Sequence, residues 1–447
     1  MVREWEALTP HGRCSPTPPR AHHMKDSSKI GLTGAVALVI ANMMGTGIFT
    51  TTGFLVEEMP SRTTVLLAWA LGGGLALLGA ICYGDLVRQW PESGGEYLFL
   101  SRALHPSMGY VAGWVSLFVG FSAPTAAAAY AAGAYARADG FEPDPRWMGT
   151  FWIVLFSLCH GKGIGMGARI QNALVLLKLI LLLGVMTWAW TKMEVPEISQ
   201  KEPVELSTFS VSLVWIYFSY CGWNAAVYIA SEVRDPRRQL PFALVAGTLL
   251  VTFFYVALNA LFLWGVPLDV LAGRENVARV AFDYLGGSSL GSMVSFVVLM
   301  ALLSSISSMT MAGPRVYAKM ASDGYLPLWF AKASAPGWAC VWLQGGLAIS
   351  MLWLPTFKQL LSYMGFTLGI SASLSILGLM RHKIRYPETI QVTGWPWIPA
   401  FFLLIVFWVT LFSIWKEPIP SMMGMLTLFV GWAIWWGRKK SLPTPSA

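Results

Sequence analysis

The 447-residue chain contains few charged residues and few cysteines. Only 12% of its residues are charged and 55% are hydrophobic, with a mean hydropathy of +0.56. A soluble domain carries about 25% charged residues, so this composition disfavours a soluble protein. The 5 cysteines and 6 histidines are scattered, without the spacing of a disulfide framework, a zinc site or an HExxH motif. We therefore expect no metal and no cofactor.

The sequence also lacks a polar segment long enough to form a soluble domain. A membrane helix needs roughly 20 apolar residues to cross about 30 Å of hydrocarbon. Stretches of this kind predict an all-α integral membrane protein with twelve transmembrane helices. The first six lie near 30–55, 62–87, 107–136, 147–161, 170–191 and 208–230. The last six lie near 241–267, 290–312, 337–355, 359–380, 397–415 and 420–437.

The distribution of basic residues predicts the orientation, because short cytoplasmic loops retain Lys and Arg. With the N-terminus inside, most of the 31 basic residues fall on the cytoplasmic side. We therefore predict disordered cytoplasmic tails at 1–29 and 438–447 and a multi-pass protein of the cell (plasma or inner) membrane. The net charge of +8 then reflects topology and requires no nucleic acid partner. Met24 is a second candidate translation start, which N-terminal sequencing of the native product would test.

Two predicted spans are interrupted near their middle by small and polar residues. The segments are "NMMGTGIF" (42–49) in the first span and "YFSYCGWNA" (217–225) in the sixth. Irregular backbone at membrane depth is tolerated where it lines a cavity or is buried in protein. Paired interruptions at corresponding places indicate a secondary transporter built from inverted repeats. The repeats would cover 30–192 and 208–381, five helices each, and 396–437 would add two more.

Acidic residues are missing from the centres of the predicted spans, and Lys178 is the one basic residue near such a centre. An ammonium group there costs roughly 2.5–3.5 kcal/mol, so it is a functional candidate by default. It could replace a bound cation or carry a proton, and the alternative is a lysine that extends to the interface. The absence of a buried carboxylate in a span disfavours a carboxylate proton relay.

Four motifs in this order resemble the amino acid–polyamine–organocation permeases, and especially their L-type amino acid transporter-like branch. They are "GTGIF" (45–49), "YGDLVRQWPESGGEYLFL" (83–100), "FSYCGWNAAVYIASEVRDPRRQLP" (218–241) and "GPRVYAKMASDGYLP" (313–327). The resemblance implies a LeuT-like fold with a 5+5 inverted repeat and two further helices. It also implies an amino acid substrate held between the two interrupted helices.

The resemblance assigns the substrate carboxylate to backbone N–H groups around Gly45, Thr46 and Gly47. These groups would lie at the positive N-terminus of the second half-helix, with the glycines admitting the substrate. Thr46 could also simply cap that half-helix.

The resemblance assigns the substrate ammonium to backbone carbonyls on the other side of the site. Those carbonyls belong to Met43, Phe218, Ser219 and Cys221. Phe218 resembles an aromatic gate over the substrate, and Asn224 resembles the polar residue that steadies the second break. Packing is the alternative role for Phe218.

Lys178 matches the lysine that replaces a sodium ion in sodium-independent relatives, and Ser305 is its expected partner among several neighbouring serines. Two departures stand out: Asp85 replaces the more common Glu, and Val233 replaces the second Glu of a pair, which puts a cytoplasmic gate needing both acids in doubt. The loop "RADGFEPDPRW" (137–147) has no Cys, so we expect no disulfide-linked heavy chain and take a monomer as the simplest assembly.

The sequence thus predicts a non-enzymatic, sodium-independent amino acid transporter that works by alternating access, either as an exchanger or with proton coupling. Neutral substrates are favoured, because no acidic side chain is expected at the pocket. The alternatives are a permease for basic amino acids or polyamines, and an amino acid receptor that does not transport. A membrane-embedded enzyme is a weaker alternative, because no nucleophile, base and orienting acid converge on one span.

Overall fold

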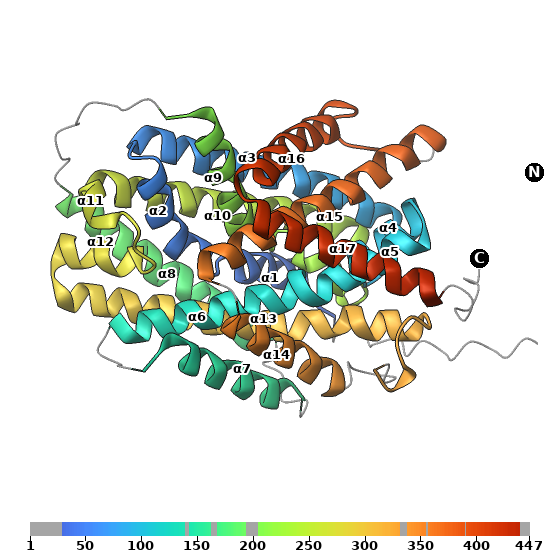
Figure 1. Ribbon diagram of the computed structural model, residues 1–447, viewed down its shortest axis with the longest axis horizontal. Helices are drawn as coiled ribbons and strands as arrows, with labels where there is room; N and C mark the ends of the chain where they lie inside the picture. Colours follow the sequence, from blue (N-terminus) through green and yellow to red (C-terminus); the bar gives the residue numbers. More distant parts are fainter. Residues whose placement is uncertain are drawn as a thin grey trace, which may run out of the picture.

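The computed structural model describes residues 29–138, 143–161, 168–193, 204–330, 338–354, 356–388 and 390–438. The predicted disordered tails, apart from residues 29 and 438, lie outside the described residues. Across these ranges the chain is helical, and the one β-type pairing is an isolated bridge between Ile30 and Val233. The helices run roughly parallel to one another along the long axis of Figure 1.

Among the described residues, nine helical elements lie before residue 193. They are α1 (Leu32–Met43), α2 (Gly47–Glu58), α3 (Arg62–Gln89), α4 (Glu96–Ala103), α5 (Pro106–Val115), η2 (Ser116–Ser122), α6 (Ala123–Ala138), α7 (Pro145–Gly161) and α8 (Ala168–Lys192). The next element is α9 (Leu206–Tyr220). The others are η3 (Ala225–Glu232), α10 (Pro236–Gly265), α11 (Leu268–Leu271), α12 (Val277–Gly286), α13 (Ser288–Ser322), η4 (Leu328–Phe330), α14 (Trp338–Trp353), α15 (Phe357–Arg385), α16 (Trp397–Lys416) and α17 (Pro418–Arg438).

Nine helical segments of the described chain are long and apolar enough to cross a membrane. The predicted spans near 147–161 and 208–230 contain the shorter helices α7 and α9, and α14 is a shorter apolar helix. The finding establishes a multi-pass helical membrane protein, while the count of twelve stays a prediction.

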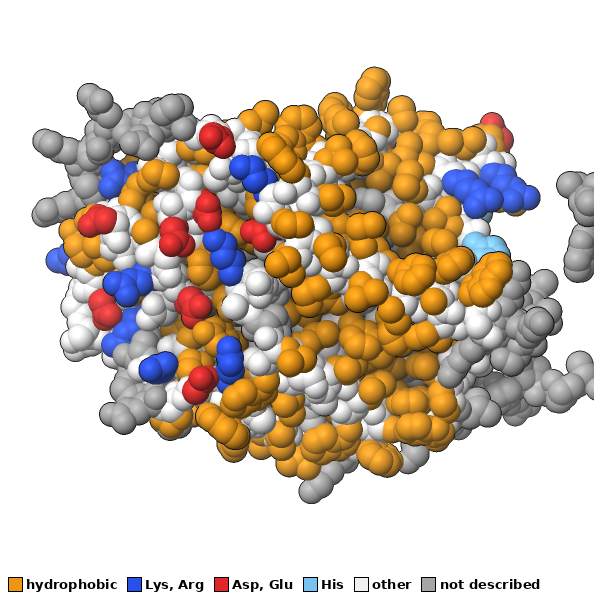
Figure 2. Space-filling model, in the orientation of Figure 1, with side chains coloured by type: hydrophobic (Ala, Val, Ile, Leu, Met, Phe, Trp, Pro, Cys, Tyr) orange, Lys and Arg blue, Asp and Glu red, His pale blue; other side chains and the backbone are white. Residues whose placement is uncertain are grey.

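The interrupted first span lies at the centre of the protein, and the last two helices lie at its edge. In the most apolar window of Leu32–Glu58, 83% of the residues are buried, against 28% for α16 and α17. Since lipid tails solvate apolar side chains, helices with many exposed apolar residues belong at the lipid boundary. Figure 2 agrees: apolar side chains cover the middle of the visible face, and charged side chains gather towards its ends.

Polar caps mark the starts of two long helices. Ser61 precedes α3 and accepts a hydrogen bond from the Thr64 N–H, and Thr356 and Gln359 form a reciprocal capping box at the start of α15. Such caps satisfy backbone N–H groups that have no partner within the helix.

The π-helical segment η2, between α5 and α6, was not predicted from the sequence. Segments of this kind are frequent at functional sites.

Candidate functional site

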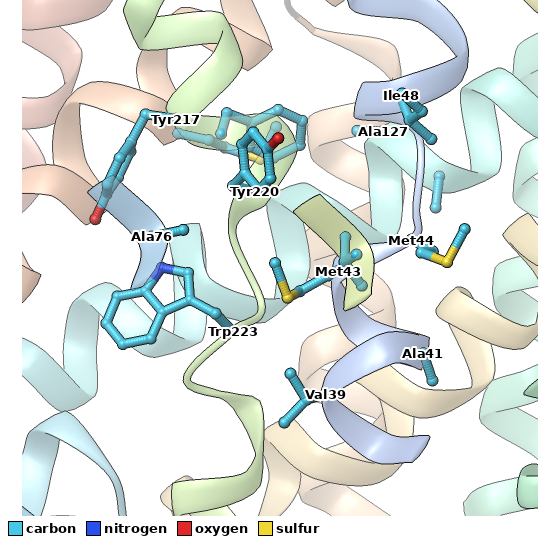
Figure 3. Packing of buried hydrophobic residues seen from close by; sticks show 14 of the residues in the cluster. Val39, Ala41, Met43, Met44, Ile48, Ala76, Ala127, Tyr217, Tyr220 and Trp223 are labelled. Atoms are coloured by element: carbon cyan, nitrogen blue, oxygen red, sulfur yellow. The ribbon is translucent and has the colours of Figure 1, made fainter. Parts of the chain in front are cut away.

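The first span is interrupted between Met43, the last residue of α1, and Gly47, the first residue of α2. Within the interruption the Gly45 N–H donates a hydrogen bond to the Met43 carbonyl (2.8 Å). The first N–H groups of α2 have no acceptor within that helix and lie at the positive end of its dipole. Figure 3 shows the two half-helices of this span, with Met43 and Met44 at the end of α1 and Ile48 near the start of α2. The break falls within the predicted segment.

The second interruption follows Tyr220, where α9 ends, and regular structure resumes at Ala225 with the 3₁₀-helical η3. Gly222 has a φ of +106°, which residues with a Cβ rarely adopt. A Cβ on Gly222 would lie 2.7 Å from the Asn42 carbonyl carbon and oxygen. The two interruptions therefore contact each other through backbone atoms.

A cavity lies between the two interruptions. All eight predicted substrate-binding residues and Ser305 line it, so the fold brings together residues from both halves of the sequence. Further lining residues that the sequence did not single out include Asn42, Glu96, Phe121, Trp223 and Tyr228. Concave, mostly apolar sites with a few polar groups are the typical form of a small-molecule site. Substrate binding by these residues stays a prediction.

Several atoms that were predicted to receive the substrate already have partners. The Met43 carbonyl accepts hydrogen bonds from the Tyr255 hydroxyl (2.5 Å) and the Gly45 N–H, and the Phe218 carbonyl accepts one from the Cys221 N–H (2.8 Å). The Ser219 hydroxyl, which is not one of the predicted carbonyl ligands, donates to the Trp215 carbonyl (2.7 Å). A substrate ammonium must therefore share or displace these donors, because a carbonyl oxygen offers two lone pairs.

The two glycines of the first interruption have different surroundings. A Cβ on Gly47 would lie 2.4 Å from the Cα and Cβ of Ser219, so this glycine permits the close approach of α2 to α9. On Gly45 the nearest contact of a Cβ would be the Ser305 hydroxyl, at 3.3 Å. Gly45 is thus the glycine whose surroundings leave more room at the cavity.

Lys178 lies on α8, which packs against α1 and α13, and its side chain is only 5% exposed. Its Nζ atom is 3.5 Å from the Met44 carbonyl, so the ammonium group contacts the first interruption. The Ser305 hydroxyl, on α13, has no hydrogen-bond partner among the described residues. The proposed pairing of Ser305 with Lys178 therefore stays a prediction.

The expectation that no acidic side chain reaches the pocket is wrong. Glu96 is the first residue of α4, in the connection between two spans, yet it is 3% exposed and lines the cavity. Its carboxyl group accepts hydrogen bonds from Tyr83 (2.6 Å), Asn224 (3.1 Å) and Ser371. The sequence suggested a polar loop, but the chain after Gly95 turns inward and buries the segment.

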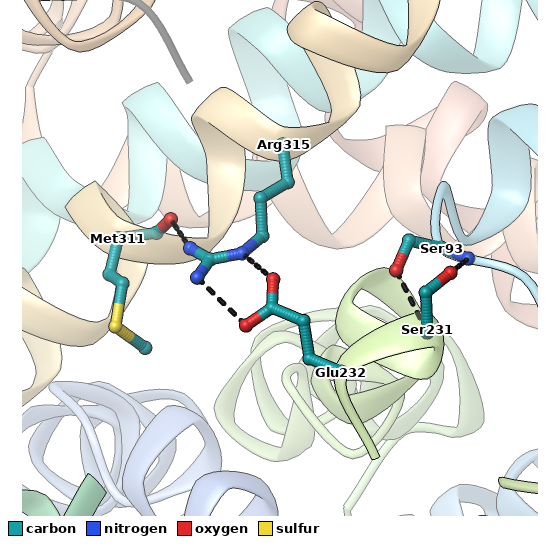
Figure 4. A network of polar contacts seen from close by, with 5 residues as sticks. All are labelled: Ser93, Ser231, Glu232, Met311 and Arg315. Carbon is teal, nitrogen blue, oxygen red and sulfur yellow. Dashed lines mark hydrogen bonds and ion pairs between the residues drawn. The ribbon is translucent and has the colours of Figure 1, made fainter. Parts of the chain in front are cut away.

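A second polar network joins η3 to α13 on the side predicted to be cytoplasmic. Arg315 forms a two-pronged ion pair with Glu232, with N–O distances of 2.5 and 3.1 Å, and it also donates to the Met311 carbonyl (Figure 4). Beside it, Ser93 and Ser231 exchange two hydrogen bonds between backbone N–H groups and hydroxyls. Glu232 alone supplies the acid of this contact, so the ion pair needs no second acid at the position of Val233.

Comparison with known proteins agrees with this geometry. Residues 30–435 match the family model described as "Amino acid permease". The chain is 24% identical to the human large neutral amino acids transporter small subunit 2 over 90% of this chain and 79% of that relative. It is also 24% identical to the mouse Asc-type amino acid transporter 1, over 90% of this chain and 79% of that relative. It is 22% identical to the serine/threonine exchanger SteT of Bacillus subtilis (strain 168), over 94% of this chain and 99% of the exchanger. With nearly the whole chain matched, the protein belongs to the amino acid permease family, in the L-type amino acid transporter-like branch of the amino acid–polyamine–organocation superfamily.

Proposed function

We propose that this permease, which is a transport protein and not an enzyme, carries neutral amino acids across the cell membrane by alternating access. The observation that carries the proposal is the cavity between the two helix interruptions. Backbone N–H groups of Thr46 and Gly47 would bind the substrate carboxylate, and carbonyls at the end of α9 would bind its ammonium. The Gly45 N–H already donates to the Met43 carbonyl (2.8 Å). All α-amino acids carry a carboxylate and an ammonium group, so the proposed site recognises these two groups of the substrate before its side chain.

Twelve spans in a 5+5 inverted repeat, with two added helices, complete the proposed architecture. The interruption in α1–α2 and the one in α9–η3 occupy corresponding places at the start of the proposed repeats 30–192 and 208–381. Both termini would face the cytoplasm of a plasma or inner membrane, in keeping with the basic residues of the loops.

Sodium independence is the proposed consequence of Lys178. Its ammonium group lies beside the Met44 carbonyl, where a bound cation would otherwise interact with that oxygen. An ammonium group at this place would stabilise the irregular backbone through its contact with that carbonyl. Transport would then need no sodium gradient, and exchange of one amino acid for another is the simplest mode.

Neutral substrates remain the favoured class, although Glu96 lines the cavity. Three hydrogen-bond donors already surround its carboxyl group, which leaves it poorly placed to receive a cationic side chain. Two of the relatives named above are large neutral and serine/threonine transporters by name. A carrier of basic amino acids is the second candidate, because Glu96 is an acid in the cavity wall.

The protein is proposed to act without a disulfide-linked partner. The segment 137–147 contains no Cys, although one relative is named as a small subunit. Purification of the chain alone from a membrane under non-reducing conditions should therefore yield an active monomeric carrier.

Counterflow in proteoliposomes tests the proposed function. Vesicles loaded with one unlabelled amino acid should accumulate the same labelled amino acid, and a panel of leucine, serine, alanine, arginine and glutamate identifies the class. Equal rates in sodium and potassium buffers are expected. Saturable binding without counterflow for every member of the panel would instead indicate a receptor, and counterflow restricted to arginine would favour the second candidate.

A further inference from the structure

Glu96 is a buried acid held by residues from three separate parts of the fold. Tyr83 comes from α3, Asn224 from the second interruption and Ser371 from α15. Tyr83 and Asn224 both donate to Oε1, and the Ser371 hydroxyl contacts Oε2. The carboxyl group therefore lines the cavity and is hydrogen-bonded to the second interruption, a segment that must move in the proposed alternating-access cycle.

No cationic side chain balances Glu96 among the described residues that contact it. The titratable groups close enough to interact with its charge come from α3, α9, the second interruption and η3; they are Tyr83, Tyr217, Cys221 and Tyr228. All four are uncharged near neutral pH. On α15 the nearest charged residue, Arg381, lies about 15 Å along the helix from Ser371. The α5 segment packed against α4 contains no charged residue, and Asp85 of α3 is held by Arg88 and Thr393.

The site can hold Glu96 with or without a proton. A serine hydroxyl both donates and accepts hydrogen bonds, so the contact between Ser371 and Oε2 persists if the proton resides on Oε2. Glu96 lies outside the spans Arg62–Gln89 and Pro106–Arg137. Burial raises the pKa of its carboxyl group above the ordinary value, and the hydrogen bonds from Ser371, Tyr83 and Asn224 act in the opposite direction.

We propose that Glu96 is a proton-binding site of the transport cycle, charged while Asn224 donates to it and protonated when the second interruption rearranges around the substrate. The inference rests on the proposed transport function and deepens it. Once Asn224 turns from Glu96 to the substrate, the carboxylate loses one of its three donors and its proton affinity rises. Substrate binding then takes up one proton, and by linkage acidification strengthens substrate binding.

Difference infrared spectroscopy of the full chain in membranes tests the proton site directly. Raising the pH should remove one buried carboxyl C=O band, and this band should be absent in Glu96→Gln. Glu92→Gln is the matched control, because Glu92 is exposed in the same connection and lies 3.8 Å from Arg102. A band that persists in Glu96→Gln, or a wild-type spectrum with no such band at any pH, would overturn the proposal.

The pH profile of counterflow, with the best-transported member of the amino acid panel, tests the coupling. Wild type and Glu92→Gln should show the same rise in apparent affinity on acidification, whereas Glu96→Gln should transport with an affinity that does not vary with pH. If Glu96→Gln does not fold, Ser371→Ala is the variant to measure. Glu96 then loses one hydrogen-bond donor, so the midpoint of the pH dependence of apparent affinity should move to higher pH by about one unit. An unchanged midpoint, or a wild-type profile in Glu96→Gln, would contradict the coupling.

The two proposals fail separately. If no amino acid gives counterflow but the Glu96 band titrates, the transport proposal is lost and the proton site remains. If counterflow is robust but independent of pH in wild type, transport stands and the proton coupling is wrong.

Discussion

Gly222 and Asn42 lie in van der Waals contact through their backbones, although 180 positions separate them in the sequence. One belongs to the second interruption and the other to the last turn of α1. No side chain separates the two interruptions at this point. Movement of either interruption therefore requires the other to move or the contact to break.

Substitution of Gly222 should disable transport and lower stability. Alanine at this position combines a φ of +106° with a Cβ 2.7 Å from the Asn42 carbonyl, so Gly222→Ala should cost about 2 kcal/mol or more. The melting temperature in detergent and the counterflow rate measure the two effects. Gly74→Ala, on α3 with no atom near its Cβ, is the control and should leave both unchanged or raise the melting temperature slightly. Equal behaviour of the two variants would show that the contact is unimportant.

The glycines of the first interruption should respond differently to alanine. Gly47→Ala places a Cβ against the Ser219 backbone and should lower the melting temperature strongly. Gly45→Ala meets only the Ser305 hydroxyl and should fold, but it should weaken substrate binding about tenfold by crowding the cavity. Thermal shift with the transported amino acid separates the two cases. Unaltered affinity in folded Gly45→Ala would argue against the proposed substrate position.

Loss of the Lys178 ammonium should stop or strongly slow uptake while the protein stays folded. The reason is that the carbonyl of Met44 then lacks its cationic neighbour and the first interruption loses its geometry. Counterflow with and without sodium is the measurement for Lys178→Ala, and a monodisperse gel-filtration peak establishes folding. Lys192→Ala, at the exposed end of the same helix, should transport normally. Wild-type rates in Lys178→Ala, whatever the sodium concentration or pH, would refute the role.

The ion pair between Arg315 and Glu232 should keep the cytoplasmic side closed. Both side chains are partly exposed, so the pair is worth about 1 kcal/mol, which corresponds to about a fivefold shift in population. Arg315→Gln should therefore raise the labelling rate of Cys221, which lines the cavity, by an impermeant thiol reagent applied from the cytoplasmic side.

The same measurement in a Cys221→Ser variant identifies the labelled residue, because labelling of Cys221 should then disappear. Glu232→Gln should give the same increase, and the double variant should not exceed either single one, because both changes remove the same contact. Slower labelling in Arg315→Gln would mean that the pair holds the cytoplasmic side open.

The two interruptions could be predicted from the sequence because their physical signal is local. Small and polar residues within an apolar stretch, as in "GTGIF", have few uses at membrane depth other than an irregular backbone near a cavity. Family resemblance then supplied the residues that line the cavity, and the structure brings them together. The spans near 147–161 and 208–230 were harder to define, since helices α7 and α9 are short.

Glu96 was missed because its burial depends on tertiary structure. A charged residue between two spans is expected in an exposed loop. No local sequence pattern predicts that three hydrogen-bond donors surround it in the folded protein. One signal was present: the glycine pair before it allows a sharp turn, with φ of +55° at Gly95, and apolar residues follow at once in "YLFL". The pairing of Arg315 with Glu232 is likewise long-range and has no signature in either segment.

The isolated bridge between Ile30 and Val233 links the chain ahead of the bundle to the far end of η3. The Ile30 N–H donates to the Glu232 carbonyl (2.8 Å), and the Ile30 carbonyl accepts from the Arg234 N–H (2.9 Å). Glu232 itself and Arg234, on either side of Val233, are thus hydrogen-bonded to the segment that leads into α1. Any pull on the amino-terminal segment would be transmitted through two hydrogen bonds to the acid that pairs with Arg315.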